Sequence, residues 1–426
     1  MKKKFLILCF CFLLIITGCS KKEDIEKKGK KGESIILTND FSINAIKTTN
    51  SIIKEENYLI SPYSMEIALN MVREGAKGTT KEELDKVVAK RDIKDVSIKD
   101  KIGIANTIFI KDNYENIIEK DYKKVLTKDY NAEMLLDKFE SPKVINDWTS
   151  EKTKGMIKEL IKELPDRFVM GLANAIAIDV KWQIPFMCEG TNKEKFKLVS
   201  GDTLNVEMMH NSYDYGAKYI SNDDMKGIIL PYEAYNSKTG EVDYEGGKAL
   251  EFVAILPNKD ISAYINNLTK EDLDNIDKSS KEASNKLNII LGLPRFTYEF
   301  DYSKFGSMLN KMGINTMFDI NNADFTNIIN KDNQIKYLEG NLHIDSAIHK
   351  TFIDLNEAGT KAAAVTSFIF TDSASIEREE PKRINIIFDK PFIYIIRDRD
   401  SKEILFFGTV YEPNKWKGST CSDEEN

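Results

Sequence analysis

Six stretches of this 426-residue chain carry strong β-strand signals, and they constrain its fold more than any other feature. Several are long, apolar on both alternating faces, and rich in isoleucine, valine and phenylalanine, as is typical of strands that are covered on both sides. The chain must therefore build large, buried sheets. The six stretches are residues 102–110, 173–182, 250–257, 287–300, 384–398 and 403–413.

Helical patterns occupy much of the remaining chain. Residues 61–76, 144–164 and 304–314 place apolar side chains at the helical period, with a break expected at Gly155. Between residues 35 and 412 there is no internal repeat and no linker rich in proline, glycine or serine. The predicted fold class is α+β, in one domain that is built on large sheets.

The amino-terminal residues predict export from the cell. Residues 1–18 join a lysine-rich start to an apolar run that ends at Ile16, which is the pattern of a signal peptide and too short for a membrane-spanning helix. The residues Ile16-Thr17-Gly18-Cys19 fit the bacterial lipobox, in which the cysteine thiol receives a lipid. An ordinary secretory signal that happens to contain a cysteine is the alternative.

A lipid on Cys19 would anchor the protein to the outer face of a membrane. We therefore expect a bacterial lipoprotein at the cell surface, with residues 19–36 as a tether, a folded domain over 37–413 and a polar tail over 414–426. The formal charge is −7, and removal of residues 1–18 takes away three lysines and no acid, which leaves −10. That acidic balance argues against nucleic acid as a partner.

Catalytic patterns are missing from the sequence. The three histidines are His210, His343 and His349, and no serine lies in a Gly-x-Ser-x-Gly elbow. The last two histidines are six residues apart, which matches no common metal-ligand spacing, and no phosphate-binding glycine loop is present. We predict no catalytic residue, no metal and no cofactor.

Several segments resemble the serpin family and follow one another in the family's order. The helix start "NYLISPYS", the segment "INDWTSEKTKGMIKELI" and the strand "ANAIAIDVKW" are followed by "IHKTFIDLNEAGTKAAA" and "FDKPFIYIIRDRDSKEILFFGTVYEP". The resemblance covers nearly all of residues 40–413. It implies about eight or nine helices around three β-sheets, an exposed reactive-centre loop, and a monomer.

The resemblance also implies a mechanism. A target protease attacks the loop as a substrate and forms an acyl-enzyme, and the cut loop then inserts as a new strand of the large sheet, which distorts the protease. The hinge would comprise Glu357, Gly359, Thr360, Ala362, Ala363 and Ala364. Lys361 replaces a glutamate that is common in inhibitory relatives.

The residues that would insert suit a buried strand. One alternating face, from Thr360 through Ala362 and Ala364 to Phe370, carries no charge before Asp372. Burial of an unpaired carboxylate would cost several kcal/mol, so insertion should end near Asp372. Inserted residues add ladder hydrogen bonds worth ~1 kcal/mol each, or on the order of 10 kcal/mol for about a dozen. The alternative is an alanine-rich helix that Thr360 caps.

The family spacing from Gly359 places the scissile bond at Ser373–Ala374, which suggests an elastase-like or subtilisin-like target. A count back from "FDKPF" gives a later position near Glu379, and Arg378 between them would suit a trypsin-like protease. The resemblance also assigns Ser61, Ser64, Asn174 and His349 to a polar cluster under the parting strands. It assigns Trp182 and Glu357 to the end of the sheet where the loop enters.

Two functions remain open. The leading hypothesis is a suicide inhibitor of serine proteases, and of cysteine proteases as well, which forms a covalent complex with its target. The alternative is a non-inhibitory binding or structural lipoprotein with the serpin fold, which a protease cuts as a plain substrate.

Overall fold

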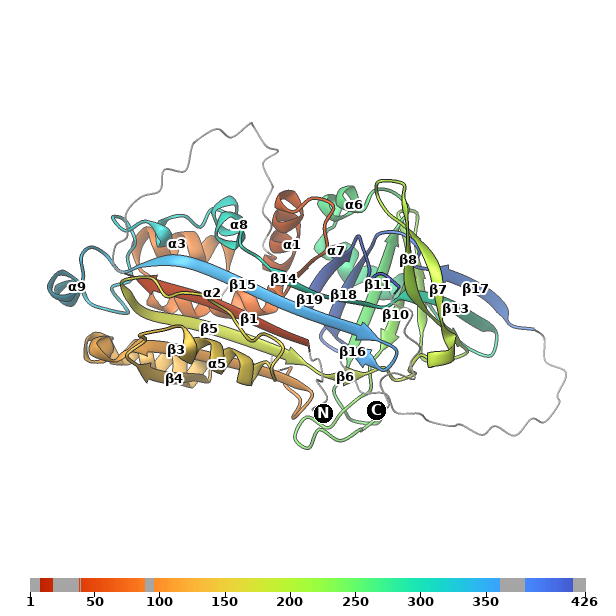
Figure 1. Cartoon of the computed structure of the whole chain (residues 1–426), viewed down its shortest axis with the longest axis horizontal. Helices are drawn as coiled ribbons and strands as arrows, with labels where there is room; N and C mark the ends of the chain where they lie inside the picture. The colour runs from red at the N-terminus through yellow and green to blue at the C-terminus, as the bar shows by residue number, and fades with distance from the viewer. Residues whose placement is uncertain (1–7, 18–37, 39, 89–95, 361–379, 417–426) are drawn as a thin grey trace.

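A computed structural model describes residues 8–17, 38, 40–88, 96–360 and 380–416. Within these ranges the chain forms nine α-helices and three β-sheets, so the predicted α+β fold is confirmed. The sheets fill most of the elongated molecule, and the longest strand runs along much of its length (Figure 1). That strand is β15 (His343–Asn356), which contains the start of the family-like segment "IHKTFIDLNEAGTKAAA".

The large sheet holds the segments that matter for function. Its strands follow the order β4, β3, β5, β1, β15, β16 and β6, and β14 also pairs with β15. Their bounds are β4 (Ala132–Asp137), β3 (Ile102–Lys111), β5 (Phe168–Ile178), β1 (Leu8–Thr17), β16 (Gly359–Thr360), β6 (Val180–Lys181) and β14 (Phe296–Asp301). All eleven residues of β5 are buried, as its unbroken apolar pattern predicts.

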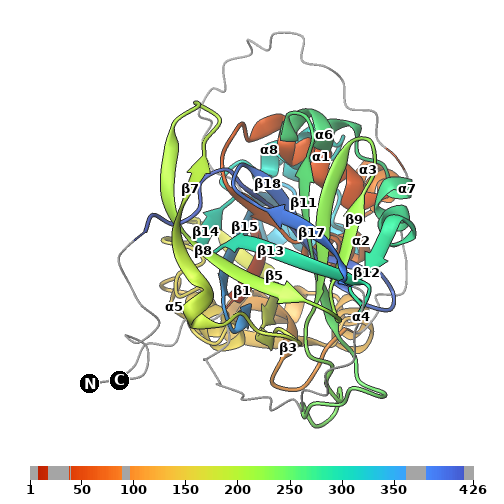
Figure 2. The same cartoon turned by 90° about the vertical axis from the view of Figure 1, so that its right-hand side faces the viewer.

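The other two sheets lie beside one another toward one end of the molecule, and this end faces the viewer in Figure 2. One contains β12 (Ser280–Glu282), β9 (Lys218–Ser221), β10 (Met225–Pro231), β11 (Leu250–Pro257), β18 (Phe392–Asp398), β19 (Ile404–Val410) and β2 (Tyr58–Ile60), in that order. The other contains β17 (Lys382–Ile387), β13 (Leu287–Pro294), β8 (Thr203–Tyr213) and β7 (Thr191–Lys197).

Helix α2 (Pro62–Gly75) packs between the large sheet and the second sheet, against β5, β1 and β19. It begins where sequence predicts, because the Ser61 hydroxyl accepts a hydrogen bond from the Ser64 backbone N–H and Pro62 needs no partner there. The other helices are α1 (Phe41–Ile52), α3 (Gly78–Val87), α4 (Lys120–Asp129), α5 (Lys143–Lys152), α6 (Ile261–Asn267), α7 (Lys270–Asn275), α8 (Phe305–Lys311) and α9 (Lys331–Tyr337). Short 3-10 turns are η1 (Asp112–Ile117), η2 (Cys188–Gly190), η3 (Ile276–Ser279) and η4 (Thr316–Phe318).

The helix predicted over residues 144–164 is wrong in its second half. Helix α5 ends at Lys152, and the following residues turn through positive φ at Lys154 and Gly155. Beyond the turn, the Asn146 side chain accepts hydrogen bonds from the backbone N–H groups of Leu160 and Ile161. The Asn146 side chain thus accepts hydrogen bonds from backbone N–H groups that would donate to backbone carbonyl groups if residues 156–164 were helical.

Two predicted strands each divide into two. Residues 287–300 form β13 and β14, and residues 384–398 form parts of β17 and β18, with each pair split between different sheets. The breaks fall at Arg295 and at residues 388–391. Continuous apolar composition therefore predicts buried strand but does not reveal where the chain crosses from one sheet to the next.

Candidate functional site

An extra strand lies in the middle of the large sheet. Strand β1 pairs antiparallel with β5 on one side and with β15 on the other, from Leu8 to Thr17 (Figure 1). The sequence predicts a signal peptide for these residues, yet in the whole chain they complete the sheet. This sheet can therefore admit a strand between β5 and β15.

The predicted hinge begins at one end of the same gap. Gly359 and Thr360 form β16, which pairs with Leu355 and Asn356 of β15 and with the two residues of β6. The Trp182 indole Nε1–H donates to the Asn356 carbonyl oxygen at 3.0 Å, and the Trp182 backbone N–H donates to the Ala358 carbonyl oxygen at 3.1 Å. Trp182 therefore holds the turn between β15 and β16.

Gly359 fits where a side chain would not. Its φ is +153°, and an added Cβ would lie 2.3 Å from the carbonyl oxygen of Val180. Thr360 is fully buried, and its hydroxyl lies 2.5 Å from the Tyr232 hydroxyl. The Tyr232 ring stacks on Trp182 at 4.5 Å. Thr360 is thus the second residue of the short strand β16. The alanine-rich helix that it could cap would lie on residues 361 onward, outside the described residues.

Glu357 lies beside the turn, and its polar atoms contact three other residues. Its carboxylate accepts a hydrogen bond from the Thr191 hydroxyl at 2.7 Å, and it lies 3.8 Å from the Arg295 guanidinium. The Phe186 backbone N–H donates to its carbonyl oxygen at 2.9 Å. These contacts tie the turn after β15 to β7 of the third sheet and to the residue after β13.

The four residues predicted for the polar cluster do come together under the large sheet. The Ser61 backbone N–H donates to His349 Nε2 at 3.1 Å, and the Ser64 hydroxyl donates to Asn174 Oδ1. Asn174 in turn donates through its side-chain amide to Asn106 Oδ1 at 2.7 Å. All four predicted residues are fully buried, and α2 carries the link between β5 and β15.

Burial keeps the His349 ring neutral. Its Nε2 accepts a hydrogen bond, so that nitrogen carries no proton, and desolvation lowers the pKa of His349 from 6.5 to about 3. The cluster is therefore a set of neutral hydrogen-bonding groups between two strands. Such groups can exchange partners when strands part, without exposing or burying a charge.

Strand β1 lies directly over this cluster. Phe12 is paired with His349 on β15 and with Asn174 on β5, so β1 separates the two strands that the cluster joins from beneath. The site as a whole is the position between β5 and β15, which β1 occupies here, with Gly359 and Thr360 at one end and the polar cluster beneath its centre. This position can bind an added strand through backbone hydrogen bonds, and it disfavours charged side chains on the buried face of that strand.

Other predicted site residues lie outside the described residues. These are Cys19, the hinge alanines Ala362, Ala363 and Ala364, the predicted bond at Ser373–Ala374, and the rival Arg378. Sequence reasoning missed Asn106, Tyr232, Thr191 and Arg295. Asn106 left a signal, because a lone asparagine interrupts the apolar strand 102–110 and faces Asn174 across the ladder.

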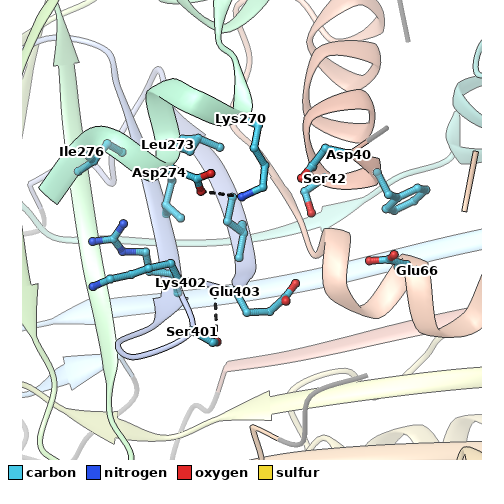
Figure 3. A pocket seen from close by; sticks show the side chains of 14 residues that line it. Asp40, Ser42, Glu66, Lys270, Leu273, Asp274, Ile276, Ser401, Lys402 and Glu403 are labelled. Atoms are coloured by element: carbon cyan, nitrogen blue, oxygen red, sulfur yellow. Dashed lines mark hydrogen bonds and ion pairs between the residues drawn. The ribbon is translucent and has the colours of Figure 1, made fainter. Parts of the chain in front are cut away.

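A separate pocket of 270 Å³ opens between the start of α1, helix α7 and the turn that joins β18 to β19 (Figure 3). Its cations already have protein partners. Lys270 lies 2.6 Å from Asp274, Lys402 lies 3.0 Å from Glu251, and Arg397 lies 2.8 Å from the same Glu251. The pocket therefore offers a ligand little unpaired charge.

Among the described residues, no group of three or more histidine, cysteine, aspartate or glutamate side chains is placed so that it could hold a metal ion. Among the helices in those same ranges, none combines the length and apolarity that crossing a membrane requires.

Comparison with known proteins relates this architecture to one family. Residues 37–413 match the family model described as "Serpin (serine protease inhibitor)". An uncharacterized serpin-like protein of Thermococcus kodakarensis is 29% identical, over 92% of this chain and 88% of that protein. Leukocyte elastase inhibitor A of Mus musculus is 29% identical, over 88% of this chain and 97% of that protein. The native crystal structure of the thermophilic serpin tengpin matches with a TM-score of 0.71 and 29% identity, over 94% of this chain and 100% of that one.

Proposed function

This chain belongs to the serpin family, and we propose that it is a suicide inhibitor of a serine protease, which it traps by insertion of its cleaved loop into the large sheet. Members of this family generally inhibit proteases.

The observation that carries the proposal is the geometry of the gap. Gly359 and Thr360 already pair between β15 and β6, at the head of a position that an entire strand can fill. A cut loop that continued from Thr360 into this position would run antiparallel to both β5 and β15. Its inserting face has no charge before Asp372, so the buried side of the new strand would stay apolar or weakly polar.

The chemistry belongs to the protease. Its serine Oγ attacks the carbonyl carbon of Ser373 and loses its proton, the bond to the Ala374 nitrogen breaks, and that nitrogen gains the proton as the new amine leaves. An ester then joins the loop to the protease. Insertion of residues up to Asp372 carries the ester away from the hinge before water can hydrolyse it.

The target we propose accepts small side chains, as elastase-like and subtilisin-like proteases do. The residues at the proposed bond, Ser373, Ala374 and Ser375, have small side chains. The relative from Mus musculus carries the name of an elastase inhibitor, which agrees with that choice. Arg378 is the rival, and it would select a trypsin-like protease instead.

We further propose that the chain is a surface lipoprotein, anchored through Cys19 after removal of residues 1–18, and that it acts as a monomer. The support is the lipobox order at residues 16–19 and the polar tether that follows. In this arrangement the lipid is the sole contact with the membrane, and the gap faces soluble proteases.

One gel tests the inhibitory mechanism. The processed chain, which begins at residue 19 or 20, is incubated with elastase, subtilisin or trypsin and is run under denaturing conditions. We expect a covalent band at the mass of the protease plus the inhibitor fragment that ends at Ser373, together with a released fragment that begins at Ala374. Clean cleavage without that band would favour the non-inhibitory alternative, and release at Arg378 would overturn the assigned bond.

A further inference from the structure

The strand that fills the gap comes from this chain's own amino-terminus. We propose that Leu8–Thr17 is an intramolecular occupant of the loop-insertion site, so that a chain which retains these residues cannot trap a protease. This inference rests on the proposed function, because it assumes that the loop must enter the same position.

The pairing registers make the competition specific. Thr360 pairs with Leu355, and each step forward along an inserting loop is one step back along β15. Ala363 would therefore face Phe352, which is the present partner of Cys9. On the other side, Ala363 would face Ala177, and Ala177 also pairs with Cys9.

The far ends coincide as well. Asp372 is twelve residues beyond Thr360. On β15 it would face His343, which is twelve residues before Leu355. On the other side it would face Phe168, which is twelve residues before Val180. Thr17 pairs with both His343 and Phe168. Strand β1 thus pairs with the same residues of β5 and β15 that Ala362 to Asp372 would pair with. The register shift near Ile16 explains why β1 spans this stretch with ten residues and the loop would need eleven.

Both segments would also run in the same direction, antiparallel to β5 and β15. Each backbone N–H and C=O along the edges of β5 and β15 can pair with one strand only. The segment Leu8–Thr17 carries no charge, and neither do residues 362–371. The two segments are therefore alternative occupants of one ladder, and removal of residues 1–18 has a second consequence besides exposing Cys19: it empties the insertion site.

The first experiment tests the position of β1 without any protease. In the full chain with Cys9, Cys11 and Cys19 replaced by serine, Leu13→Cys is combined with Ala173→Cys, its partner on β5. Directly opposed residues are within reach of a disulfide. The matched control combines Leu13→Cys with Ala177→Cys, another buried alanine on the same face but four residues along the strand, roughly 13 Å away.

We expect oxidation to close the Leu13–Ala173 pair and not the control pair, as read from the faster migration of the closed chain on a non-reducing gel. Failure of the first pair, or equal closure of both, would overturn the assigned position of β1.

The second experiment tests the consequence in the full chain. Phe12→Pro with Leu14→Pro removes ladder donors from β1, whereas Lys22→Pro with Asp24→Pro adds the same residues outside it. The loop is then nicked, and melting temperatures are compared before and after. We expect a rise on nicking in the β1 variant and none in the control or in the unmodified full chain.

The outcomes separate the two proposals. A rise in all three proteins would refute the blockade by β1 while leaving the inhibitory mechanism intact. If the β1 variant shows no rise although the Leu13–Ala173 disulfide forms, the proposed loop insertion is refuted and the position of β1 stands.

Discussion

The buried His349 should make the stability of this protein depend on pH in a calculable way. Its Nε2 accepts a hydrogen bond from the Ser61 backbone N–H, and burial holds its pKa at about 3. In the unfolded chain the same side chain titrates near the ordinary value of about 6.5. Between these two pKa values the unfolded state therefore binds one more proton than the folded state.

The sign follows from that difference. The folded pKa is depressed, so the contribution is fully present above pH 6.5 and is lost as pH falls toward 3. Each pH unit within the window lowers the free energy of unfolding by about 1.4 kcal/mol. Over the interval from pH 7 to pH 5, the loss due to His349 is about 2 kcal/mol, since the first half unit lies above the unfolded pKa.

The measurement is urea unfolding at pH 7 and pH 5 for the unmodified chain and for His349→Gln, which cannot gain a proton but can still accept a hydrogen bond. The unmodified chain should lose about 2 kcal/mol more than the variant across that interval. His343→Gln, on the same strand, keeps His349 and should keep the larger loss. Equal losses in the unmodified chain and His349→Gln would refute the assignment of a buried, neutral His349.

Three further predictions concern the hinge and the anchor. Thr360→Arg places a charge where a fully buried hydroxyl meets Tyr232, which should cost several kcal/mol. Gels of this variant with protease should therefore show more cleavage and less covalent complex. An undiminished amount of complex would argue against insertion at this residue. Gly359→Val forces a Cβ against the Val180 carbonyl oxygen and should lower the melting temperature, whereas an unchanged value would show that the turn relaxes freely. Cys19→Ser should move the protein from the membrane fraction to the soluble fraction and abolish the lipid mass, and retention in the membrane would refute lipid attachment there.

Local patterns predicted most elements of the fold. The apolar stretches at 102–110 and 250–257 form β3 and β11, with bounds that differ from the prediction by at most one residue. Such strands are easy to locate because a strand that is buried on both faces is apolar at nearly every residue. The helix at α2 was equally clear, since Ser61 and Pro62 mark its start. Where a decisive contact was distant in sequence, prediction failed, as when Asn146 bonds the backbone near Leu160 and ends the helical pattern.

The candidate site divides in the same way. The family order identified Ser61, Ser64, Asn174 and His349, and the structure brings them together under the sheet. It did not identify Tyr232, because a tyrosine after a buried strand gives no local sign that it will stack on Trp182 and meet Thr360. Nor could it identify β1, because an apolar run at the amino-terminus has the same composition whether it directs export or completes a sheet.

The central claim is that the processed chain accepts its own cut loop as a strand between β5 and β15. Calorimetry of this chain before and after a single cut in the loop tests it most directly. The account predicts a clear upward shift of the melting temperature after the cut, because about a dozen residues gain a ladder on both sides. Superimposable melting curves for the intact and cut protein would contradict it.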